Sequence, residues 1–357
     1  MQLLKYLPRI INKRGMPLNV IYFVTSKCNA QCGHCFYWNR LNTVKDELTL
    51  AEIEKTAKNI PDIISLSLTG GEPFLRSDLI EIASIFSKFT RVSYLQIPSN
   101  GILTDTIIKT IEEIIKRCRK NILISVGISI DDLFDKHDIL RQTKGCFSNA
   151  TETLKKLKLL EAKYKNFRVG CIITINKNNQ KNIISMVDFL KREFSVDEIG
   201  INLIRSEVKN PSLKEINIQY YDEIMLKLRR DFLCRAKDQP ASWLDRVLSA
   251  RQYYGALLLS KIFSQNKYVT PCYAGSLLAI IRENGDVNPC EMLDDRMGNL
   301  RDFNYNFKEL WFSKEAERIR KTIKRNRCFC TYECAATFNT LFNATHLFHI
   351  IKGSLLK

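Results

Sequence analysis

The sequence lacks any uninterrupted apolar run of the roughly 18 residues that would span a bilayer. It also lacks the continuous apolar region and small-residue cleavage site of a secretory signal, because its first residues interleave charged with apolar side chains. It contains no low-complexity segment and none of the short patterns typical of nucleic-acid-binding modules, so we expect no nucleic-acid partner. These absences favour a globular protein of the cytoplasm.

Acidic residues are too few to balance the basic ones. Lysine and arginine number 55 against 38 aspartate and glutamate residues, which gives a formal net charge of +17. The simplest interpretation is a lysine-rich surface in water, but the excess would also attract an acidic electron donor such as flavodoxin or ferredoxin, an anionic substrate, or a membrane surface. Residues 3–14 and 347–357 are both apolar and basic, so each is expected either to contact a membrane surface or to pack against the domain.

Cysteine, in contrast, is abundant, with twelve residues in a chain of 357. A disulfide framework would be expected in a secreted and usually shorter chain. Clustered cysteines in a chain without a secretion signal indicate metal or redox chemistry instead. Cys118, Cys146, Cys171 and Cys234 stand apart from the clusters and are interpreted as small core residues.

The first two thirds of the chain alternate short runs rich in valine and isoleucine with helical patterns. Such nearly continuous apolar runs are typical of parallel strands that are buried on both faces. Six strand–helix repeats with right-handed crossovers predict an α/β fold, a partial (β/α)6 TIM-like barrel whose active-site loops follow the strands. The predicted strands are residues 19–25, 65–69, 92–98, 122–130, 168–175 and 198–204. A capping box at Thr49 and Glu52 predicts the start of the first helix.

Five segments are expected along the chain. An N-terminal extension (1–17) precedes the barrel core (18–205), and a helical bridge (206–267) follows, predicted from helical patterns at 220–234 and 243–263. A small cysteine-rich α+β domain (268–335) and a C-terminal tail (336–357) complete the chain. Asn284-Gly285, between apolar residues, predicts a hairpin turn in the small domain.

Three cysteines follow the first predicted strand in the run Cys28-Asn-Ala-Gln-Cys32-Gly-His-Cys35. Three thiolates this close together can bind three irons of a cubane 4Fe–4S cluster and leave the fourth iron open. An open coordination position distinguishes a reactive metal site from a structural one, and an iron with free positions can chelate an amino and a carboxylate group. The alternative is a zinc site formed by these cysteines with His34.

This Cys-x3-Cys-x2-Cys spacing after the first strand resembles the radical S-adenosylmethionine (SAM) superfamily. Other predicted strand ends carry further parts of the family pattern. The second strand ends in Gly70-Gly71-Glu72-Pro73, which looks like the family's GGEP loop, and two glycines let backbone groups approach a ligand closely. The third ends in Ser99-Asn100-Gly101, similar to TNG. The fourth ends in Ser129-Ile130-Asp131-Asp132, similar to SxDG with Asp132 in place of the usual glycine.

The resemblance implies roles for several of these residues. The GGEP loop would bind the amino group of SAM, and Ser129 and Arg141 would contact its other polar groups, since the arginine fork suits a carboxylate. His34 occupies the position before the third cysteine, which is usually aromatic in the family, and is expected beside the adenine. The remaining candidate SAM contacts are Asn100, Asp131 and Arg205. No catalytic residue is identified.

A second group of cysteines lies in the C-terminal part. The spacing Cys272-x12-Gly285-x4-Cys290 resembles the opening of a SPASM domain, the auxiliary-cluster module of many radical SAM enzymes, here in a shortened, twitch-like form. Five thiols can hold one 4Fe–4S cluster and not two. A structural zinc site with the same cysteines is the alternative. The expected cluster ligands are Cys272, Cys290, Cys330 and Cys334, with Cys328 as a competitor or an unliganded fifth thiol.

The resemblance implies an enzyme, a radical SAM oxidoreductase. An external reductant would supply one electron to the three-cysteine cluster, and SAM would be cleaved to methionine and a 5′-deoxyadenosyl radical that takes a hydrogen atom from the substrate. Enzymes with the appended module often modify peptides or proteins, so the expected substrate is a peptide or protein side chain. The alternatives are a sugar, nucleotide or lipid-linked small molecule and, as a different class, a non-catalytic metal-stabilised binding protein.

Overall fold

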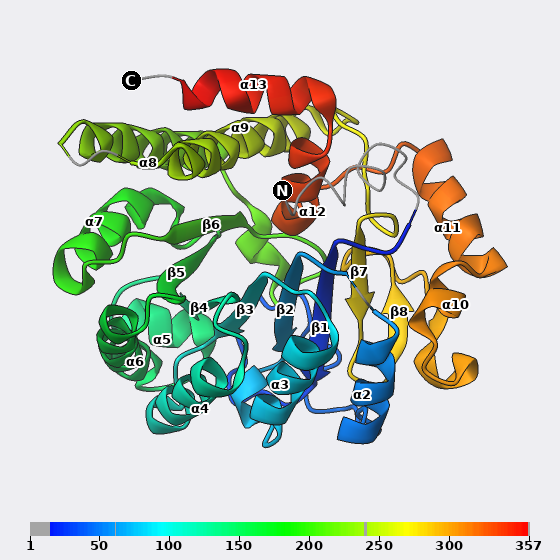
Figure 1. Cartoon of the computed structure of the whole chain (residues 1–357). Coiled ribbons are helices and arrows are strands. Elements are labelled where there is room, and N and C mark those ends of the chain that lie inside the picture. The colour runs from blue at the N-terminus through cyan, green and yellow to red at the C-terminus, as the bar shows by residue number, and fades with distance from the viewer. Residues whose placement is uncertain (1–14, 61, 239–240, 356–357) are drawn as a thin grey trace.

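A computed structural model describes residues 15–60, 62–238 and 241–355 of the chain. Its centre is a curved sheet in the strand order β6-β5-β4-β3-β2-β1-β7-β8-β9, shown in Figure 1. Strands β1 to β6 pair in parallel, each with its neighbour in the chain. The predicted partial (β/α)6 barrel is therefore confirmed, with every strand within two residues of its expected ends. The strands are β1 (Asn19–Thr25), β2 (Ser65–Gly70), β3 (Tyr94–Ser99), β4 (Leu123–Ser129), β5 (Phe167–Ile175) and β6 (Ile199–Leu203).

Helices cover the outer face of this sheet (Figure 1). Side chains from strands, such as Leu66 and Leu95, share one buried cluster with Ile107 and Ile111 of the helix after β3. The first helix begins at the predicted capping box, in which the Thr49 side chain accepts from the Glu52 backbone N–H. The helices are α2 (Leu50–Lys58), α3 (Leu79–Phe89), α4 (Thr104–Arg117), α5 (Asp135–Arg141), α6 (Cys146–Lys163) and α7 (Ile183–Phe194).

The inner face of the barrel is more polar than predicted. Along β2 and β3, buried residues alternate with half-buried ones, and the half-buried positions include Ser67, Tyr94 and Gln96. The prediction of strands buried on both faces was therefore wrong for these two strands, and β6 alternates in the same way. Because the barrel is only partly closed, its inner face borders a space that apolar side chains do not fill.

The C-terminal part extends the barrel sheet on the far side of β1. Strand β7 (Leu278–Ile281) pairs in parallel with β1, so that Ile280 lies opposite Ile21. Strands β8 (Asp286–Asn288) and β9 (Gly298–Asn299) continue the sheet in antiparallel fashion. The predicted turn at Asn284-Gly285 joins β7 to β8, and Gly285 has a φ of +88°, a value that favours glycine.

The remaining helices pack around the open side and the C-terminal part. The two helices of the predicted bridge are present, and α13 packs along α9, where Val247, Ala250 and Ile350 form one buried cluster. The predicted membrane contact of residues 3–14 falls on residues that the structure does not describe. Within residues 15–355 and outside their short gaps, no helix has the length and apolar character needed to cross a membrane. These helices are α8 (Ile218–Asp238), α9 (Trp243–Gln265), α10 (Phe307–Trp311), α11 (Lys314–Arg325), α12 (Glu333–Leu341) and α13 (Ala344–Ser354).

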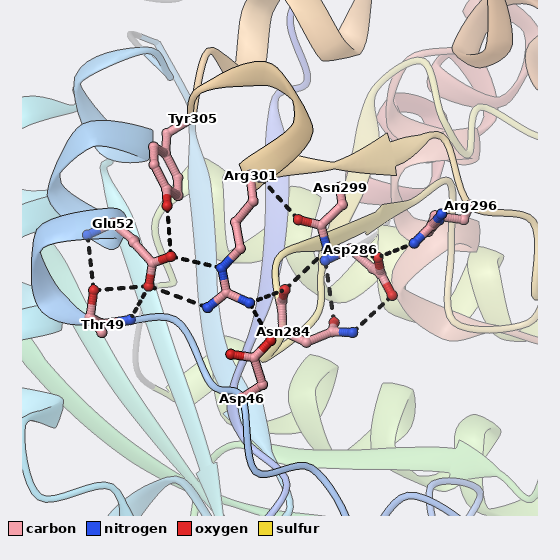
Figure 2. Close-up of polar contacts among 9 residues, drawn as sticks. All are labelled: Asp46, Thr49, Glu52, Asn284, Asp286, Arg296, Asn299, Arg301 and Tyr305. Atoms are coloured by element: carbon pink, nitrogen blue, oxygen red, sulfur yellow. Dashed lines mark hydrogen bonds and ion pairs between the residues drawn. The ribbon is translucent and has the colours of Figure 1, made fainter.

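A polar clamp joins the start of α2 to the β7–β9 region, as Figure 2 shows. Arg301 donates from Nε to Oε1 of Glu52 (2.7 Å) and from Nη1 to Oδ2 of Asp46 (2.6 Å). The Tyr305 hydroxyl donates to the same Glu52 oxygen (2.7 Å), and the Arg301 backbone N–H donates to Oδ1 of Asn299 (2.9 Å). Glu52 thus serves both the capping box of its own helix and the attachment of the C-terminal hairpin to the barrel.

Candidate functional site

The loop after β1 carries Cys28, Cys32 and Cys35 and is held by two other segments of the barrel. The backbone N–H of Gly33 donates to the Leu140 carbonyl at the end of α5 (3.1 Å), and the Asn210 N–H donates to the Gly33 carbonyl (2.8 Å). These bonds hold the cysteine loop between the end of α5 and the segment after β6.

The three cysteines line one cavity of about 180 Å³ at the carboxyl ends of the strands. This is the edge of the sheet where the loops of a βα barrel form active sites. No fourth cysteine lines the cavity among the residues that the structure describes. The other lining residues are Ala30, Leu41, Thr69, Gly70, Gly71, Glu72, Pro98, Ser99, Asn100, Ser129 and Arg141.

The two glycines after β2 bring backbone next to the cysteine loop. A Cβ atom added at Gly71 would lie 2.2 Å from the Lys27 carbonyl oxygen, and one added at Gly70 would lie 2.2 Å from the Thr25 carbonyl oxygen. Gly70 also has a φ of +141°. No residue with a side chain fits either position without moving the loop, because real Cβ atoms do not approach other atoms this closely.

Glu72 is buried and ties the end of β2 to the end of β3. Its Oε1 accepts from the Ser99 hydroxyl (2.9 Å), and its Oε2 accepts from the Asn100 backbone N–H (2.8 Å). Burial raises the pKa of Glu72 to about 7, although these donors favour its ionised form. Asn100 in turn donates from Nδ2 to Oδ1 of Asn29 in the cysteine loop (2.7 Å). Glu72 and Asn100 together therefore couple three loops of the cavity wall.

Arg141 lines the cavity with its charge already paired. Its Nε and Nη2 both donate to Oδ2 of Asp131, at 2.9 and 2.5 Å, and Nε2 of His34 lies 3.3 Å from the same oxygen. The other oxygen of Asp131 accepts from the Thr174 backbone N–H (2.8 Å). Burial opposes ionisation of Asp131, but Arg141 and His34 outweigh it and hold the pKa of that carboxyl well below its usual range.

The expected SAM contacts divide into two sets. Those that line the cavity are Gly70, Gly71, Glu72, Asn100, Ser129 and Arg141. Those that do not line it are His34, Pro73, Asp131 and Arg205. His34 and Asp131 form a layer beside Arg141, and Nδ1 of His34 is buried without a hydrogen-bond partner among the described residues.

Arg205 belongs to a different contact, between the end of β6 and the C-terminal part. Its guanidinium donates to Glu291 and to Glu333, both at 3.1 Å, and it lies over the rings of Phe36 and Tyr332 at 5.1 and 4.7 Å. The structure thus places Arg205 behind the aromatic residue that follows Cys35 rather than on the cavity wall.

The sequence reading missed several wall residues. Thr69 and Pro98 precede the recognised loops and line the cavity from β2 and β3. The alternation of side chains along a strand could have found them, because side chains two positions apart point to the same face. Thr69 lies two positions after Ser67 on β2, and Pro98 lies two positions after Gln96 on β3. Asn29, between the first two cysteines, was also missed, and no local pattern marks its bond to Asn100.

Four cysteines of the C-terminal part lie together. Cys328 and Cys272 share a hydrogen bond, which raises the pKa of Cys272 and lowers that of Cys328 to about 7. Cys290 and Cys330 are close enough to these two thiols to interact with them electrostatically, and burial raises the pKa of Cys290 to about 12 and that of Cys330 to about 11. The space beside Cys272, Cys328 and Cys330 is only about 10 Å³.

Cys334 stands in different surroundings from these four. It is the second residue of α12, its side chain is exposed, and the charged groups beside it are Glu291, Arg205 and Glu333. This differs from the expected ligand set, in which Cys334 was preferred to Cys328. The difference arises because the start of α12 fixes the direction of residue 334, which spacing along the chain cannot report.

Burial favours the neutral, protonated form of the thiols of Cys28, Cys32 and Cys35. Burial raises the pKa of Cys28 to about 11 and that of Cys35 to about 12, and it also raises the pKa of Cys32. Thiolate ligands must be deprotonated, so a metal bound at these positions would displace their protons.

The sequence matches two protein families. Residues 22–190 match the radical SAM superfamily, and residues 272–335 match an iron–sulfur cluster-binding domain, SPASM. The first range contains the three-cysteine loop and the cavity wall. The second range contains Cys272, Cys290, Cys328, Cys330 and Cys334.

Curated relatives are similar at 23–31% identity. An uncharacterized protein of Methanocaldococcus jannaschii is 29% identical over 59% of this chain and 71% of its own length. The sporulation killing factor maturation protein SkfB of Bacillus subtilis is 26% identical over 80% of this chain and 63% of its own. The AdoMet-dependent heme synthase of Methanosarcina barkeri is 23% identical over 87% and 86%. The chain spans only 41% of the length of two other curated relatives.

Solved structures share the fold at lower identity. The enzyme anSMEcpe with bound AdoMet aligns over 94% of this chain and 96% of its own, with a TM-score of 0.60 and 18% identity. Streptococcus suis SuiB bound to S-adenosylmethionine aligns over 89% and 72%, with a TM-score of 0.59 and 18% identity. The two family matches, over residues 22–190 and 272–335, support a radical SAM enzyme with a SPASM-like C-terminal domain, whose cofactors are SAM and 4Fe–4S clusters, and the solved structures share its fold.

Proposed function

We propose that Cys28, Cys32 and Cys35 hold the 4Fe–4S cluster at which SAM is cleaved, and that the enzyme modifies a peptide or protein side chain. The observation that carries the first part is the cavity wall, where three thiols but no fourth described cysteine face the glycine pair and Arg141. Three thiolates can hold three irons and leave one for SAM.

The residues present fit both cofactors. Gly70 and Gly71 line the cavity and let the end of β2 pack directly against the cysteine loop, and Glu72 ties this segment to the loop after β3 through Ser99 and Asn100. Arg141 lines the cavity with a charge suited to a carboxylate, and Asp131 fixes its orientation from behind.

The chain's own residues have three tasks in this proposal. The cysteine loop would bind the cluster, the loops after β2 to β4 would orient SAM through Gly71, Asn100 and Ser129, and Arg141 would donate hydrogen bonds to the carboxylate of SAM. Pairing with Asp131 costs Arg141 part of its hydrogen-bonding capacity but keeps the guanidinium in one orientation. A 4Fe–4S cluster on these cysteines would supply the one-electron reduction that cleaves SAM, and SAM would supply the radical chemistry that removes a hydrogen atom from the substrate.

Anaerobic reconstitution tests this part of the proposal. The protein should become brown, bind about eight irons, and release 5′-deoxyadenosine when dithionite and SAM are added, as measured by liquid chromatography and mass spectrometry. A colourless protein that retains zinc would refute it. A protein that binds cluster and SAM without releasing 5′-deoxyadenosine would instead be a non-catalytic scaffold.

The peptide substrate is supported by relatives. SkfB is named as a maturation protein for sporulation killing factor, and SuiB has been solved with its precursor peptide SuiA over a fold that this chain shares. A peptide that enters the barrel would meet the half-buried polar positions Ser67, Tyr94 and Gln96 of β2 and β3 as hydrogen-bond partners.

A tetrapyrrole is the second candidate substrate. The AdoMet-dependent heme synthase of Methanosarcina barkeri matches 87% of this chain and 86% of its own length, a more even coverage than that of SkfB. Deuterium transfer separates the candidates. A deuterated precursor peptide or a deuterated iron-coproporphyrin is supplied, and the true substrate class is the one that places deuterium in 5′-deoxyadenosine. Transfer from the porphyrin alone would refute the peptide proposal and leave the SAM chemistry intact.

We further propose that Cys272, Cys290, Cys328 and Cys330 hold one auxiliary 4Fe–4S cluster. The shared hydrogen bond of Cys272 with Cys328 and the electrostatic coupling of Cys290 and Cys330 to them support this set. Four thiolates would complete the coordination of this cluster, so its role would be electron relay or architecture rather than substrate binding.

An acidic protein, flavodoxin or ferredoxin, is the proposed electron donor. The support is the net charge of +17, which would speed association with a negatively charged partner. SAM cleavage driven by reduced flavodoxin should therefore slow several-fold between 50 and 300 mM NaCl, whereas cleavage driven by dithionite should change little. Equal salt responses would contradict the proposal.

A further inference from the structure

Exposed apolar side chains are concentrated on two packed helices far along the chain from the cysteine loop. The described residues include sixteen large apolar side chains that are exposed, and eight of them lie on α9, α13 or the adjoining Leu355. These two helices make up about a tenth of the chain, so the concentration is several-fold. The eight are Trp243, Leu244, Leu248, Leu257, Leu347, Phe348, Ile351 and Leu355.

Helix α13 has an apolar side that nothing in the described part of the chain covers. Ile350 is fully buried against Val247 and Ala250 of α9. Phe348, Ile351 and Leu355 are spaced three and four residues apart and therefore form a second stripe on the helix, and they are 64%, 40% and 68% exposed. A surface helix normally has one apolar side, so a second one indicates a binding surface.

The exposed side chains of the two helices lie at the same end. A Cβ at Gly353 would stand 3.5 Å from Cβ of Ala250, so the last turn of α13 lies beside the first turns of α9. Figure 1 shows α13 running along α9 at the outer edge of the molecule, away from the barrel helices α2 to α4. Trp243, Leu244 and Leu248 are therefore close to the end of the α13 stripe. We call these three side chains, together with Phe348, Ile351 and Leu355, the α9–α13 surface.

Helix α13 carries a lysine and no acidic residue. No aspartate or glutamate occurs between Cys334 and the end of the sequence, and Lys352 is exposed beside Ile351. The one acidic residue of α9, Asp245, accepts hydrogen bonds from the backbone and hydroxyl of Ser242 at the helix start (3.1 and 2.6 Å). A second copy of the chain would bring like charges together, whereas an anionic bilayer would be attracted.

We infer that the α9–α13 surface docks on the face of an anionic phospholipid bilayer, with Phe348, Ile351, Leu355 and the first turn of α9 entering the headgroup region. Two helices side by side present apolar side chains over an outer edge, which matches the way interfacial amphipathic helices lie on membranes. Trp243 and Phe348 are residue types that favour the bilayer interface. This inference does not depend on the proposed substrate or on catalysis.

Vesicle sedimentation of the reconstituted holoenzyme tests the inference. The wild-type protein should bind vesicles of equal parts phosphatidylglycerol and phosphatidylcholine, and should bind pure phosphatidylcholine vesicles much more weakly. A triple variant, Phe348→Ser with Ile351→Ser and Leu355→Ser, should lose at least tenfold in partitioning, because three apolar side chains no longer enter the bilayer. The substitution Lys352→Glu should weaken binding to the anionic vesicles severalfold and leave binding to phosphatidylcholine unchanged.

A matched control triple exists elsewhere on the molecule. Leu159, Ile184 and Phe312 have the same residue types and are also exposed, at 72%, 37% and 51%. Their replacement by serine should leave vesicle binding as in the wild type, and thermal unfolding should show that both triple variants remain folded. The inference is refuted if the wild type does not bind anionic vesicles, or if the Phe348 triple binds as the wild type does, in which case another segment such as residues 1–14 is responsible. A concentration-dependent dimer that only the Phe348 triple abolishes, without vesicle binding, would assign the surface to a second copy instead.

Discussion

The two cysteine groups of this chain have similar chemistry and opposite surroundings. Cys28, Cys32 and Cys35 sit on one loop and face a cavity of about 180 Å³, with glycine backbone and an arginine across from them. Cys272, Cys290, Cys328 and Cys330 come from three separate segments, and the space beside Cys272, Cys328 and Cys330 is only about 10 Å³. The comparison teaches that the number of local thiols and the room beside them, rather than cysteine content, distinguish a reactive cluster site from a closed one.

We call Cys28, Cys32 and Cys35 the open group, and Cys272, Cys290, Cys328 and Cys330 the closed group. The largest expected effect comes from removing one thiol of the open group. Cys28→Ala should abolish release of 5′-deoxyadenosine and lower the iron content by about four per chain, because two remaining thiolates do not hold the cluster, while the closed group keeps its own. Iron and sulfide assays with mass spectrometry of the nucleoside check this. Cys234→Ala is the control, since that cysteine is exposed on α8 and is not the core residue that the sequence predicted. SAM cleavage by the Cys28→Ala protein would contradict the proposal that Cys28, Cys32 and Cys35 hold the cluster at which SAM is cleaved.

The second prediction separates Cys328 from Cys334. Cys328→Ala should remove about four irons per chain, because Cys328 shares a hydrogen bond with Cys272 within the closed group. Cys334→Ala should retain them, because Cys334 lies beside Arg205 and two glutamates instead. Mössbauer spectroscopy of the two variants measures which cluster remains. The reverse result would restore Cys334 as a ligand and show that the closed group rearranges when metal binds.

A third, smaller effect is expected at Glu72. Glutamine has one acceptor oxygen, so Glu72→Gln leaves either the Ser99 hydroxyl or the Asn100 N–H without its acceptor, and SAM affinity should fall about tenfold. Glu54→Gln, on the exposed side of α2, should bind SAM as the wild type does. Isothermal titration calorimetry of the cluster-loaded proteins measures the affinities. Unchanged affinity in the Glu72 variant would show that the loops after β2 and β3 do not depend on this carboxyl group.

The same carboxyl group predicts a pH dependence of stability. The pKa of Glu72 is raised to about 7 by burial, so the protonated form stabilises the fold at low pH, and this contribution declines as pH rises through 7. The free energy of unfolding of the SAM-free protein should therefore decrease by about 1 kcal/mol from this group between pH 6 and pH 8. Glu333, whose pKa burial also raises to about 7, adds to the slope. Glu72→Gln should flatten the slope in part, and a slope equal to that of the wild type would contradict the assignment.

Local patterns in the sequence were sufficient for the barrel and for the open group. The strand ends place Cys28, Gly71 and Ser129 on one edge because parallel strands share their direction, so spacing alone brings these residues together. The sequence indicated a second metal site among the C-terminal cysteines, but it could not show which four of them come together, because they lie on distant segments. Arg205 illustrates the limit, because its acidic partners lie 86 and 128 residues further along the chain. The pairing of β7 with β1 is equally non-local, and no turn or periodicity indicates it.

The smallest expected effect concerns the clamp that joins the two regions. Glu52 is held ionised by Arg301, with its pKa lowered to about 2, so this contribution to stability is present above pH 4.5 and is lost as pH falls toward 2. Arg301→Met should lower the free energy of unfolding at pH 7 by about 1 kcal/mol, as measured by denaturant unfolding. Arg296→Met, which removes a more exposed pair with Asp286, should have a smaller effect.

Because the clamp attaches the hairpin between Cys272 and Cys290 to α2, Arg301→Met should also speed the loss of iron from the closed group to a chelator while leaving the open group unchanged. Equal loss from both groups would show that the two regions respond as one unit.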